Sequence, residues 1–375
     1  MEKTLVNPEP SILHHAARVL ATLTPELPAD AALRRYLAGA RRLRAGEKRA
    51  ISRVVFMFFR WREWLEAKQP IARQLEQAAA LQTRFETGPA AVKPEALAAR
   101  AVPAWLREEM ELPPDYLRQL QQEPPLWIRA RPGTAEKLAR ELGHCTTTPR
   151  APDALLYRGT QDLFLTPAFH GGAFEIQDLS SQLVALACAP RAGEVWWDAC
   201  AGEGGKLLHL GDLMGNKGLI WGTDRSERRL LVLRRRAARA QLFNFRTASW
   251  DGGARLPTKT KFDGVLLDAP CSGVGTWQRN PHARWTTTPA DVAELATLQR
   301  SLLEHVAAAV KPGGRLVYAV CTLTRSETTA VADAFQAAHP EYAPLALFGT
   351  EPRVTLWPQE LNANGMFLAA WTRAR

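Results

Sequence analysis

Two cysteines, each at the end of an apolar run, are the residues of this sequence best suited to form a covalent bond with a substrate. Residues 265–275 read V-L-L-D-A-P-C-S-G-V-G, which places Asp268 and Cys271 just after a short apolar stretch, and Cys321 ends a second one, R-L-V-Y-A-V-C. Both stretches predict buried strands. Ligands of open α/β sheets bind outside the carboxyl ends of the strands, so we expect these side chains at one site. Taken singly, either cysteine is more often a packing residue, so the prediction depends on the motif around it.

A glycine-rich loop follows another predicted strand and could hold a nucleotide-like ligand. It reads D-A-C-A-G-E-G-G-K from Asp198 to Lys206 and leads into a helix whose first N–H groups are free to bind. Leu207 stands where a P-loop needs serine or threonine and where a dinucleotide fingerprint needs its third glycine. S-adenosylmethionine is therefore the predicted ligand. Its predicted contacts in the loop are Cys200, Ala201, Gly202, Glu203, Gly204, Gly205 and Lys206.

Acidic residues after the next two strands fit the same ligand. Asp224 ends the predicted strand G-L-I-W-G-T-D and is placed to accept hydrogen bonds from both ribose hydroxyls. Asp251 follows the third strand and could reach the adenine amino group. Singly, each acid is more often a helix cap or a turn residue, but their recurrence after successive strands favours a binding site. The predicted cofactor contacts also include Arg229 and Asp268.

The order of the predicted elements gives the fold class. Strands and helices alternate from residue 193 onwards, which implies a mostly parallel, Rossmann-like α/β sheet with helices on both faces. R-V-T-L-W-P and G-M-F-L-A-A-W-T predict an antiparallel hairpin at its end. The predicted domains are a helical N-terminal domain (1–80), a proline-rich connector (81–125), a small α/β subdomain (126–172) and the catalytic domain (173–375).

The composition indicates a folded protein with an anionic partner. The net charge of +10 comes chiefly from arginine, which binds phosphate and stacks on bases, although basic helix faces are often only solvated. The five cysteines include no C-x-x-C pair, which argues against a disulfide framework or a zinc site and suits a reducing cytoplasm. No signal-peptide pattern or membrane-length apolar run is present. We therefore expect a cytoplasmic protein without membrane or metal partners.

The motifs together resemble the RsmB/Nop2/Sun family of RNA cytosine-5 methyltransferases. The resemblance is specific over about 170–375 and looser before it. Three departures are visible: Gly202-Glu203 stands where Ala-Pro is usual, Val320 where threonine often precedes the cysteine, and Asn364-Gly where Asp-Gly is usual. The matching segments are D-A-P-C-S-G (268–273), C-T-L (321–323) with Glu327, the loop 200–206, Q-D-L-S-S-Q, and L-W-P-Q-E with N-G-M-F-L-A-A-W.

The resemblance implies a mechanism with a temporary covalent bond. The resemblance implies that Cys321 is the nucleophile that adds to C6 of cytosine. It also implies that Cys271 assists the release of Cys321 by helping to remove the C5 proton. Asp268 would hydrogen-bond ring N3 and lie against the cofactor, while Lys206 would lower the thiol pKa or orient the base. RNA is the implied partner, ribosomal RNA first and tRNA second, and we expect a monomer.

Two other functions stay open at this point. An N-methyltransferase acting on adenine or glutamine would share the cofactor domain, but such enzymes carry Asn/Asp-Pro-Pro-Tyr, whereas this chain has Cys271 in place of an aromatic residue. A basic RNA-binding scaffold without activity would need neither the thiols nor the acids. Methyl transfer to RNA followed by nucleoside analysis separates all three.

Overall fold

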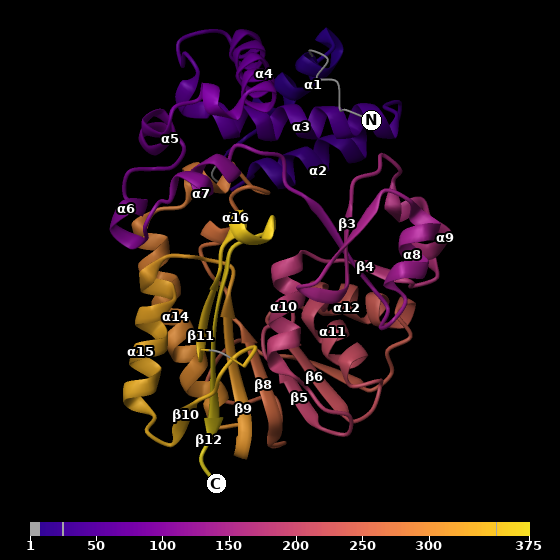
Figure 1. Cartoon of the computed structure of the whole chain (residues 1–375), viewed down its shortest axis with the longest axis vertical. Coiled ribbons are helices and arrows are strands. Elements are labelled where there is room, and N and C mark those ends of the chain that lie inside the picture. The colour runs from indigo at the N-terminus through magenta and orange to yellow at the C-terminus, as the bar shows by residue number, and fades with distance from the viewer. Residues whose placement is uncertain (1–7, 25, 350) are drawn as a thin grey trace. The chain divides into compact units, whose positions relative to one another are not determined.

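The computed structural model describes residues 8–24, 26–349 and 351–375, and contacts divide them into two compact units (Figure 1). The helical unit comprises residues 8–124 and Thr276–Thr288. The sheet unit comprises Pro125–Gly275 and Pro289–Arg375. This division differs from the four predicted domains, because the predicted connector folds with the N-terminal helices and residues 276–288 join them.

The helical unit is built on the apolar run of its third helix. Val54, Val55 and Phe59 of the sequence V-V-F-M-F-F are buried in the core of this unit. Asp30 lies in the first turn of the helix that begins at Ala29, and its carboxylate accepts a hydrogen bond from Arg34 at 3.2 Å. The helices are α1 Pro10–Leu20, α2 Ala29–Gly39, α3 Ala45–Trp61, η1 Arg62–Trp64, α4 Ile71–Thr87, η2 Pro89–Ala91, α5 Pro94–Arg100, α6 Leu106–Glu109, α7 Pro114–Gln119 and α13 Ala283–Thr286.

A buried arginine explains why residues 276–288 belong to this unit. Arg284 is fully buried and donates hydrogen bonds to the carbonyl oxygens of Ala101 at 2.8 Å and Leu120 at 3.0 Å. Burial lowers the pKa of Arg284 to about 9. Its side chain therefore fixes the returning segment to the stretch that the sequence suggested was only a connector.

The sheet unit contains a small antiparallel sheet. Its strand order is β2-β3-β1-β4, and every pair is antiparallel. The α/β pattern predicted for 126–172 is present, but β4 lies beyond that boundary and pairs with β1. The elements are β1 Leu126–Ala130, α8 Ala135–Leu142, β2 Cys145–Thr148, β3 Ala151–Tyr157, η3 Leu163–Leu165, α9 Pro167–His170 and β4 Phe174–Ile176.

The large sheet has the predicted Rossmann-like form. Its order is β10-β12-β9-β8-β5-β6-β7, and β11 pairs with β12. The pairs among β5 to β9 are parallel, whereas β12 runs antiparallel to β9, β10 and β11. The predicted C-terminal hairpin is therefore confirmed. The strands are β5 Val195–Asp198, β6 Leu219–Asp224, β7 Phe245–Ser249, β8 Phe262–Asp268, β9 Val310–Val320, β10 Tyr342–Pro344, β11 Arg353–Leu356 and β12 Met366–Arg373.

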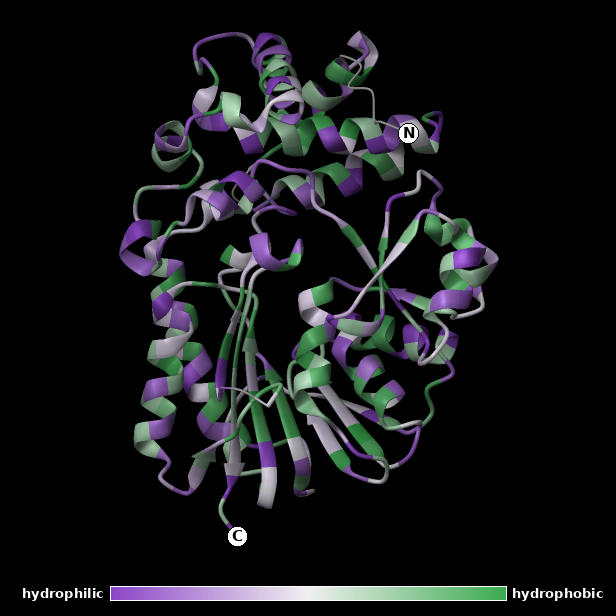
Figure 2. Ribbon diagram, in the orientation of Figure 1, coloured by the Kyte–Doolittle hydropathy of each residue, from purple (hydrophilic) through white to green (hydrophobic). Residues whose placement is uncertain are grey.

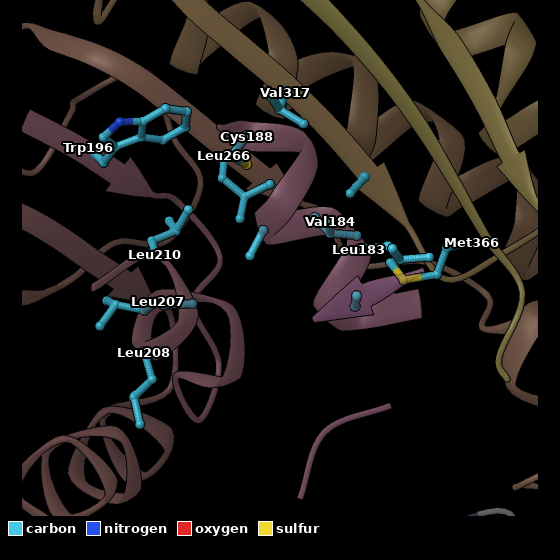
Figure 3. Packing of buried hydrophobic residues seen from close by; sticks show 14 of the residues in the cluster. Leu183, Val184, Cys188, Trp196, Leu207, Leu208, Leu210, Leu266, Val317 and Met366 are labelled. Carbon is cyan, nitrogen blue, oxygen red and sulfur yellow. The ribbon is translucent and has the colours of Figure 1, made fainter. Parts of the chain in front are cut away.

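Helices cover both faces of this sheet, because successive strand residues point to opposite sides. Trp196 packs with residues of α10, α11 and α12, whereas Trp197 packs with residues of α14 and α15. Figure 2 shows hydrophobic residues concentrated along these strands. Figure 3 shows Trp196, Leu266 and Val317 of the sheet beside α10 and α11. The helices are α10 Leu179–Cys188, α11 Gly205–Leu213, α12 Glu227–Arg239, η4 Val274–Thr276, α14 Pro289–Ala307, η5 Arg325–Glu327, α15 Thr329–Ala338 and α16 Pro358–Leu361.

Part of the arginine cluster at 225–239 is used inside the sheet unit. Glu175 of β4 is 2% exposed and pairs with Arg236 at 2.9 Å and Arg239 at 2.5 Å. These pairs join the small sheet to α12, so two of the arginines that contribute to the positive net charge are paired within the sheet unit. Over the described ranges, no helix is long and apolar enough to cross a membrane.

Candidate active site

A cavity of about 470 Å³ opens at the carboxyl ends of β5, β6 and β8. This is where ligands of open α/β sheets bind, and the volume lies within the usual range for small-molecule sites. The predicted residues that line it are Cys200, Ala201, Gly202, Glu203, Asp224, Arg229, Asp251, Asp268 and Cys271. The predicted residues outside this lining are Gly204, Gly205, Lys206 and Cys321.

The glycines of the loop after β5 have different tasks. Gly202 adopts a φ of +55°, and the space where a Cβ would stand is open, which leaves room for a ligand beside the backbone. Gly204 adopts a φ of +87°, and a Cβ there would come within 2.7 Å of Leu233. Gly204 is therefore needed for packing against α12, and Gly205 begins α11.

Asp224 connects the loop to the following helix. It is 6% exposed, and its carboxylate accepts from the N–H of Gly202 at 3.1 Å and of Ser226 at 2.8 Å. The guanidinium of Arg229 lies 3.8 Å from the same carboxylate. Each carboxylate oxygen can accept more than one hydrogen bond, so Asp224 keeps capacity for the two hydroxyls of a ribose.

The far wall of the cavity suits an aromatic ring. Trp250 is buried and donates its indole N–H to the carbonyl of Gly253 at 3.0 Å. Leu298 and Leu302, one turn apart on α14, complete this apolar wall. Asp251 is exposed at the rim, where its carboxylate accepts from the Gly253 N–H at 2.9 Å. The cavity therefore combines apolar side chains with the predicted Asp251 carboxylate at its rim.

Sequence reasoning missed several residues of this cavity. Trp250 directly precedes the predicted Asp251, so its proximity was available as a signal. Leu298 and Leu302 carried no such signal, because they lie on α14, a helix that only the tertiary fold brings to the cavity. The lining residues not predicted are Ala199, Arg225, Trp250, Gly252, Ala269, Pro270, Leu298 and Leu302.

Lys206 and Asp268 form an ion pair at the inner end of the site. The ammonium lies 2.6 Å from the carboxylate, and the side chains are 12% and 27% exposed. Burial by itself would lower the pKa of Lys206, but the charge of Asp268 and its hydrogen bond raise that pKa above its ordinary value. Burial and the charge of Asp268 raise the pKa of the neighbouring Asp198 to about 8. The site therefore holds one lysine cation beside a carboxylate.

The two predicted thiols meet beside this ion pair. The sulfur atoms of Cys271 and Cys321 lie 3.2 Å apart, and both cysteines are free thiols, half-buried. The hydrogen bond to Cys321, followed by burial, raises the pKa of Cys271 well above its ordinary value. Cys200, also at the cavity, has its pKa raised by burial and by the charges of nearby aspartates. The arrangement offers a pair of sulfurs in which one proton can be shared.

No group of three or more His, Cys, Asp or Glu residues in the described part of the chain could hold a metal ion. The parallel sheet and the cavity at the carboxyl ends of its strands define a Rossmann-like fold that binds a nucleotide-like ligand. Residues 185–372 match the model of the family described as 16S rRNA methyltransferase RsmB/F. The chain therefore belongs to the RsmB/F methyltransferase family, which confirms the resemblance and the cofactor predicted from the sequence.

Individual relatives agree with this assignment. The chain is 37% identical over 236 residues to a probable ribosomal RNA small subunit methyltransferase B of Bacillus subtilis, covering 59% of this chain and 52% of the relative. For the next two curated relatives the chain covers 64% and 65% of their length, so less than two thirds of each relative is spanned.

Solved structures show the same fold. The crystal structure of PH0851 matches 99% of both chains with a TM-score of 0.78 and 23% identity. A methyltransferase homologue from Pyrococcus horikoshii is 29% identical, with a TM-score of 0.61 over 69% of this chain and 90% of that chain. The fold of the whole chain is thus one already seen in crystals.

Proposed function

We propose that this protein transfers a methyl group from S-adenosylmethionine to C5 of a cytosine in RNA, through a temporary bond between Cys321 and C6 of the base. The observation that carries the proposal is the 3.2 Å contact between the sulfurs of Cys271 and Cys321, beside Asp268 at the edge of the cavity. Ribosomal RNA of the small subunit is the proposed substrate, since the family description and the B. subtilis relative both name it.

The residues of the cavity fit the cofactor. Asp224 would hold the ribose hydroxyls of the cofactor, and Asp251 would bind its adenine amino group. The open backbone at Gly202 would lie against the rest of the cofactor. The bound cofactor supplies a methyl group that is activated by a positively charged sulfur. The acidic character of Asp224, Asp251 and Asp268 suits a cationic ligand.

A nucleophile is needed because C5 of cytosine is too weakly nucleophilic to accept a methyl group directly. The Cys321 thiolate adds to C6, and the electron pair of the C5–C6 double bond is displaced through C4 towards N3. N3 takes up a proton from solvent as this happens, and Asp268 accepts a hydrogen bond from the N3–H. The ring is then an enamine whose C5 carries the electrons that bond to the methyl group.

Release of the product needs a base for the C5 proton. Once Cys321 is bonded to carbon it no longer carries charge, and the proton of Cys271 can pass to solvent. The Cys271 thiolate then takes the C5 proton, the C5–C6 double bond forms again, and the bond from Cys321 to C6 breaks. N3 returns its proton to solvent. One proton is released overall, as methyl transfer from a sulfonium cofactor requires.

The surface around the cavity suits a polyanion. Arg225 and Arg229 line the cavity, and Arg228 and Arg235 of the same region are also exposed. Arginine binds phosphate through two N–H groups and stacks on bases. The target cytosine must leave any base stack to reach the thiols. These arginines would hold the backbone on either side of it.

The test is methyl transfer from labelled S-adenosylmethionine to purified small-subunit ribosomal RNA, to tRNA and to total RNA, followed by nucleoside analysis. We expect label in 5-methylcytidine from the ribosomal RNA. Label in 5-methylcytidine of tRNA alone would contradict the proposed substrate. An N-methylated nucleoside, or no labelled RNA, would contradict the proposed chemistry.

A further inference from the structure

A buried carboxylate joins the two loops that carry the cysteines. Glu327 is fully buried. One of its oxygens accepts from the backbone N–H of Ser272 and from the side-chain amide of Gln299, both at 2.9 Å. The other accepts from the hydroxyls of Thr324 at 2.8 Å and Thr322 at 3.2 Å, and also from the Ser272 hydroxyl. This side chain thus binds the residue after Cys271 and the residue after Cys321.

These donors indicate that Glu327 carries a negative charge. Two of them are N–H groups, which can only donate, and they share one oxygen. The other oxygen accepts from hydroxyl groups, so both oxygens act as acceptors in these contacts. The charge acts on the neighbouring thiol, since Glu327 contributes to raising the pKa of Cys271, after Cys321 and burial.

The second sulfur faces a charge of the opposite sign. Lys206 interacts electrostatically with Cys321, in addition to its ion pair with Asp268. Glu327 and Lys206, which have opposite charges, therefore act on different members of the sulfur pair: Glu327 on Cys271 and Lys206 on Cys321. Two thiols in contact that share one proton would be equivalent in a symmetric environment, and here they are not.

We propose that Glu327 is a positioning residue that divides the roles of the two cysteines: its charge keeps the shared proton on Cys271 and leaves Cys321 as the thiolate. The inference rests on the proposed function, which needs one nucleophile and one base. It also closes the cycle. After Cys271 has taken the C5 proton and Cys321 has left the ring, the pair is again a Cys271 thiol beside a Cys321 thiolate.

Other groups around Cys271 do not supply this asymmetry. The N–H of Gly273 acts in the opposite direction and lowers the pKa of Cys271. Tyr318 is neutral, because burial raises its pKa well above the ordinary value. Its single hydroxyl proton faces two acceptors, the backbone carbonyl of Glu327 at 2.7 Å and the side-chain oxygen of Gln299 at 3.0 Å. Tyr318 therefore supports the network without adding charge.

The test measures the ionisation of each thiol without any methyl transfer. The full chain is treated briefly with iodoacetamide between pH 5 and 10, and modified peptides are counted by mass spectrometry at low conversion. In the unchanged protein we expect Cys321 to react at lower pH than Cys271. In Glu327→Gln, the midpoint for Cys271 should fall by about one to three pH units, the usual effect of removing a like charge nearby.

Thr324→Val is the matched control, because it removes one hydrogen bond to Glu327 and keeps the charge. We expect its Cys271 midpoint to stay within about half a pH unit of the unchanged protein, below the usual effect of a nearby charge. Cys145, on β2, serves as an internal reference in every sample.

The inference is overturned if Cys271 reacts at lower pH than Cys321 in the unchanged protein, a result that does not depend on any variant folding. It is also overturned if Glu327→Gln leaves the Cys271 midpoint in place, or if Thr324→Val lowers it equally. Because alkylation needs neither RNA nor cofactor, these outcomes are independent of whether the protein methylates cytosine.

Discussion

The sulfur atoms of Cys271 and Cys321 lie 3.2 Å apart, although the two residues are separated by 50 positions in the chain. The parallel pairing of β8 with β9 produces this contact, since Asp268 is in register with Ala319 and both strands end at the same edge. Cys271 follows the last residue of β8 by three positions, and Cys321 directly follows the last residue of β9. The sheet register therefore sets the distance on which the proposed chemistry depends.

Asp224→Ala should weaken cofactor binding roughly tenfold to a hundredfold, because hydrogen bonds to a charged group contribute about 1.5–3 kcal/mol. The variant loses the predicted ribose contact and also the acceptor for the Gly202 N–H. Calorimetric titration with S-adenosylmethionine measures the effect. Asp251→Ala, at the exposed rim, is the control and should change the affinity less. Equal affinities for Asp224→Ala and the unchanged protein would exclude this role.

Gly204→Ala should lower the free energy of unfolding by at least about 1–3 kcal/mol, the usual range for backbone strain and overpacking. The added Cβ would lie 2.7 Å from Leu233 at a φ of +87°. Gly205→Ala is the matched control, because a Cβ there would meet its nearest neighbour at 4.0 Å. It should change stability by less than about 1 kcal/mol. Urea unfolding of both variants makes the comparison, and equal losses would refute the distinction.

Asp198→Asn should flatten the dependence of stability on pH. Burial raises the pKa of Asp198 from 3.8 to about 8, so between these values the folded chain holds a proton that the unfolded chain releases. Stability then falls as pH rises, by up to about 1.4 kcal/mol per pH unit. Thermal unfolding between pH 5 and 8 measures the slope. A slope unchanged in the variant would show that Asp198 is not its cause.

Glu175→Ala should lower the free energy of unfolding by about 1.5–3 kcal/mol, since the half-buried guanidinium groups of Arg236 and Arg239 lose their hydrogen bonds to a buried carboxylate. Asp333→Ala is the control, because its pair with Arg353 is exposed and such pairs contribute about 0–1 kcal/mol. Denaturant unfolding gives both values. Similar losses in the two variants would count against the buried network as a support for the sheet unit.

The sheet and its cavity followed from local patterns in the sequence. Each strand that ends in Asp198, Asp224 or Asp268 is a short apolar run, and a parallel sheet brings such ends to one edge. Cys200 to Glu203 were predicted to lie at the cavity for the same reason, since they directly follow the strand that ends in Asp198. The hairpin of β11 and β12 was visible because its two apolar runs are separated by a turn sequence.

The parts that local patterns missed depend on contacts distant in sequence. Nothing around Arg284 signals that its guanidinium binds the carbonyls of Ala101 and Leu120, so the membership of residues 276–288 in the helical unit was not predictable. Arg236 and Arg239 look like surface charge in the sequence, whereas their partner Glu175 lies more than sixty residues away along the chain. Pairing of this kind is set by the tertiary fold alone.

Trapping of the covalent intermediate tests the central claim most directly. Cys271→Ala, incubated with S-adenosylmethionine and labelled small-subunit ribosomal RNA, should give a protein–RNA adduct that survives a denaturing gel, because Cys321 adds to the base but cannot be released. Cys321→Ala, alone or combined with Cys271→Ala, should give no adduct and no methyl transfer while still binding the cofactor. An adduct that persists without Cys321, or normal turnover by Cys271→Ala, would contradict the account.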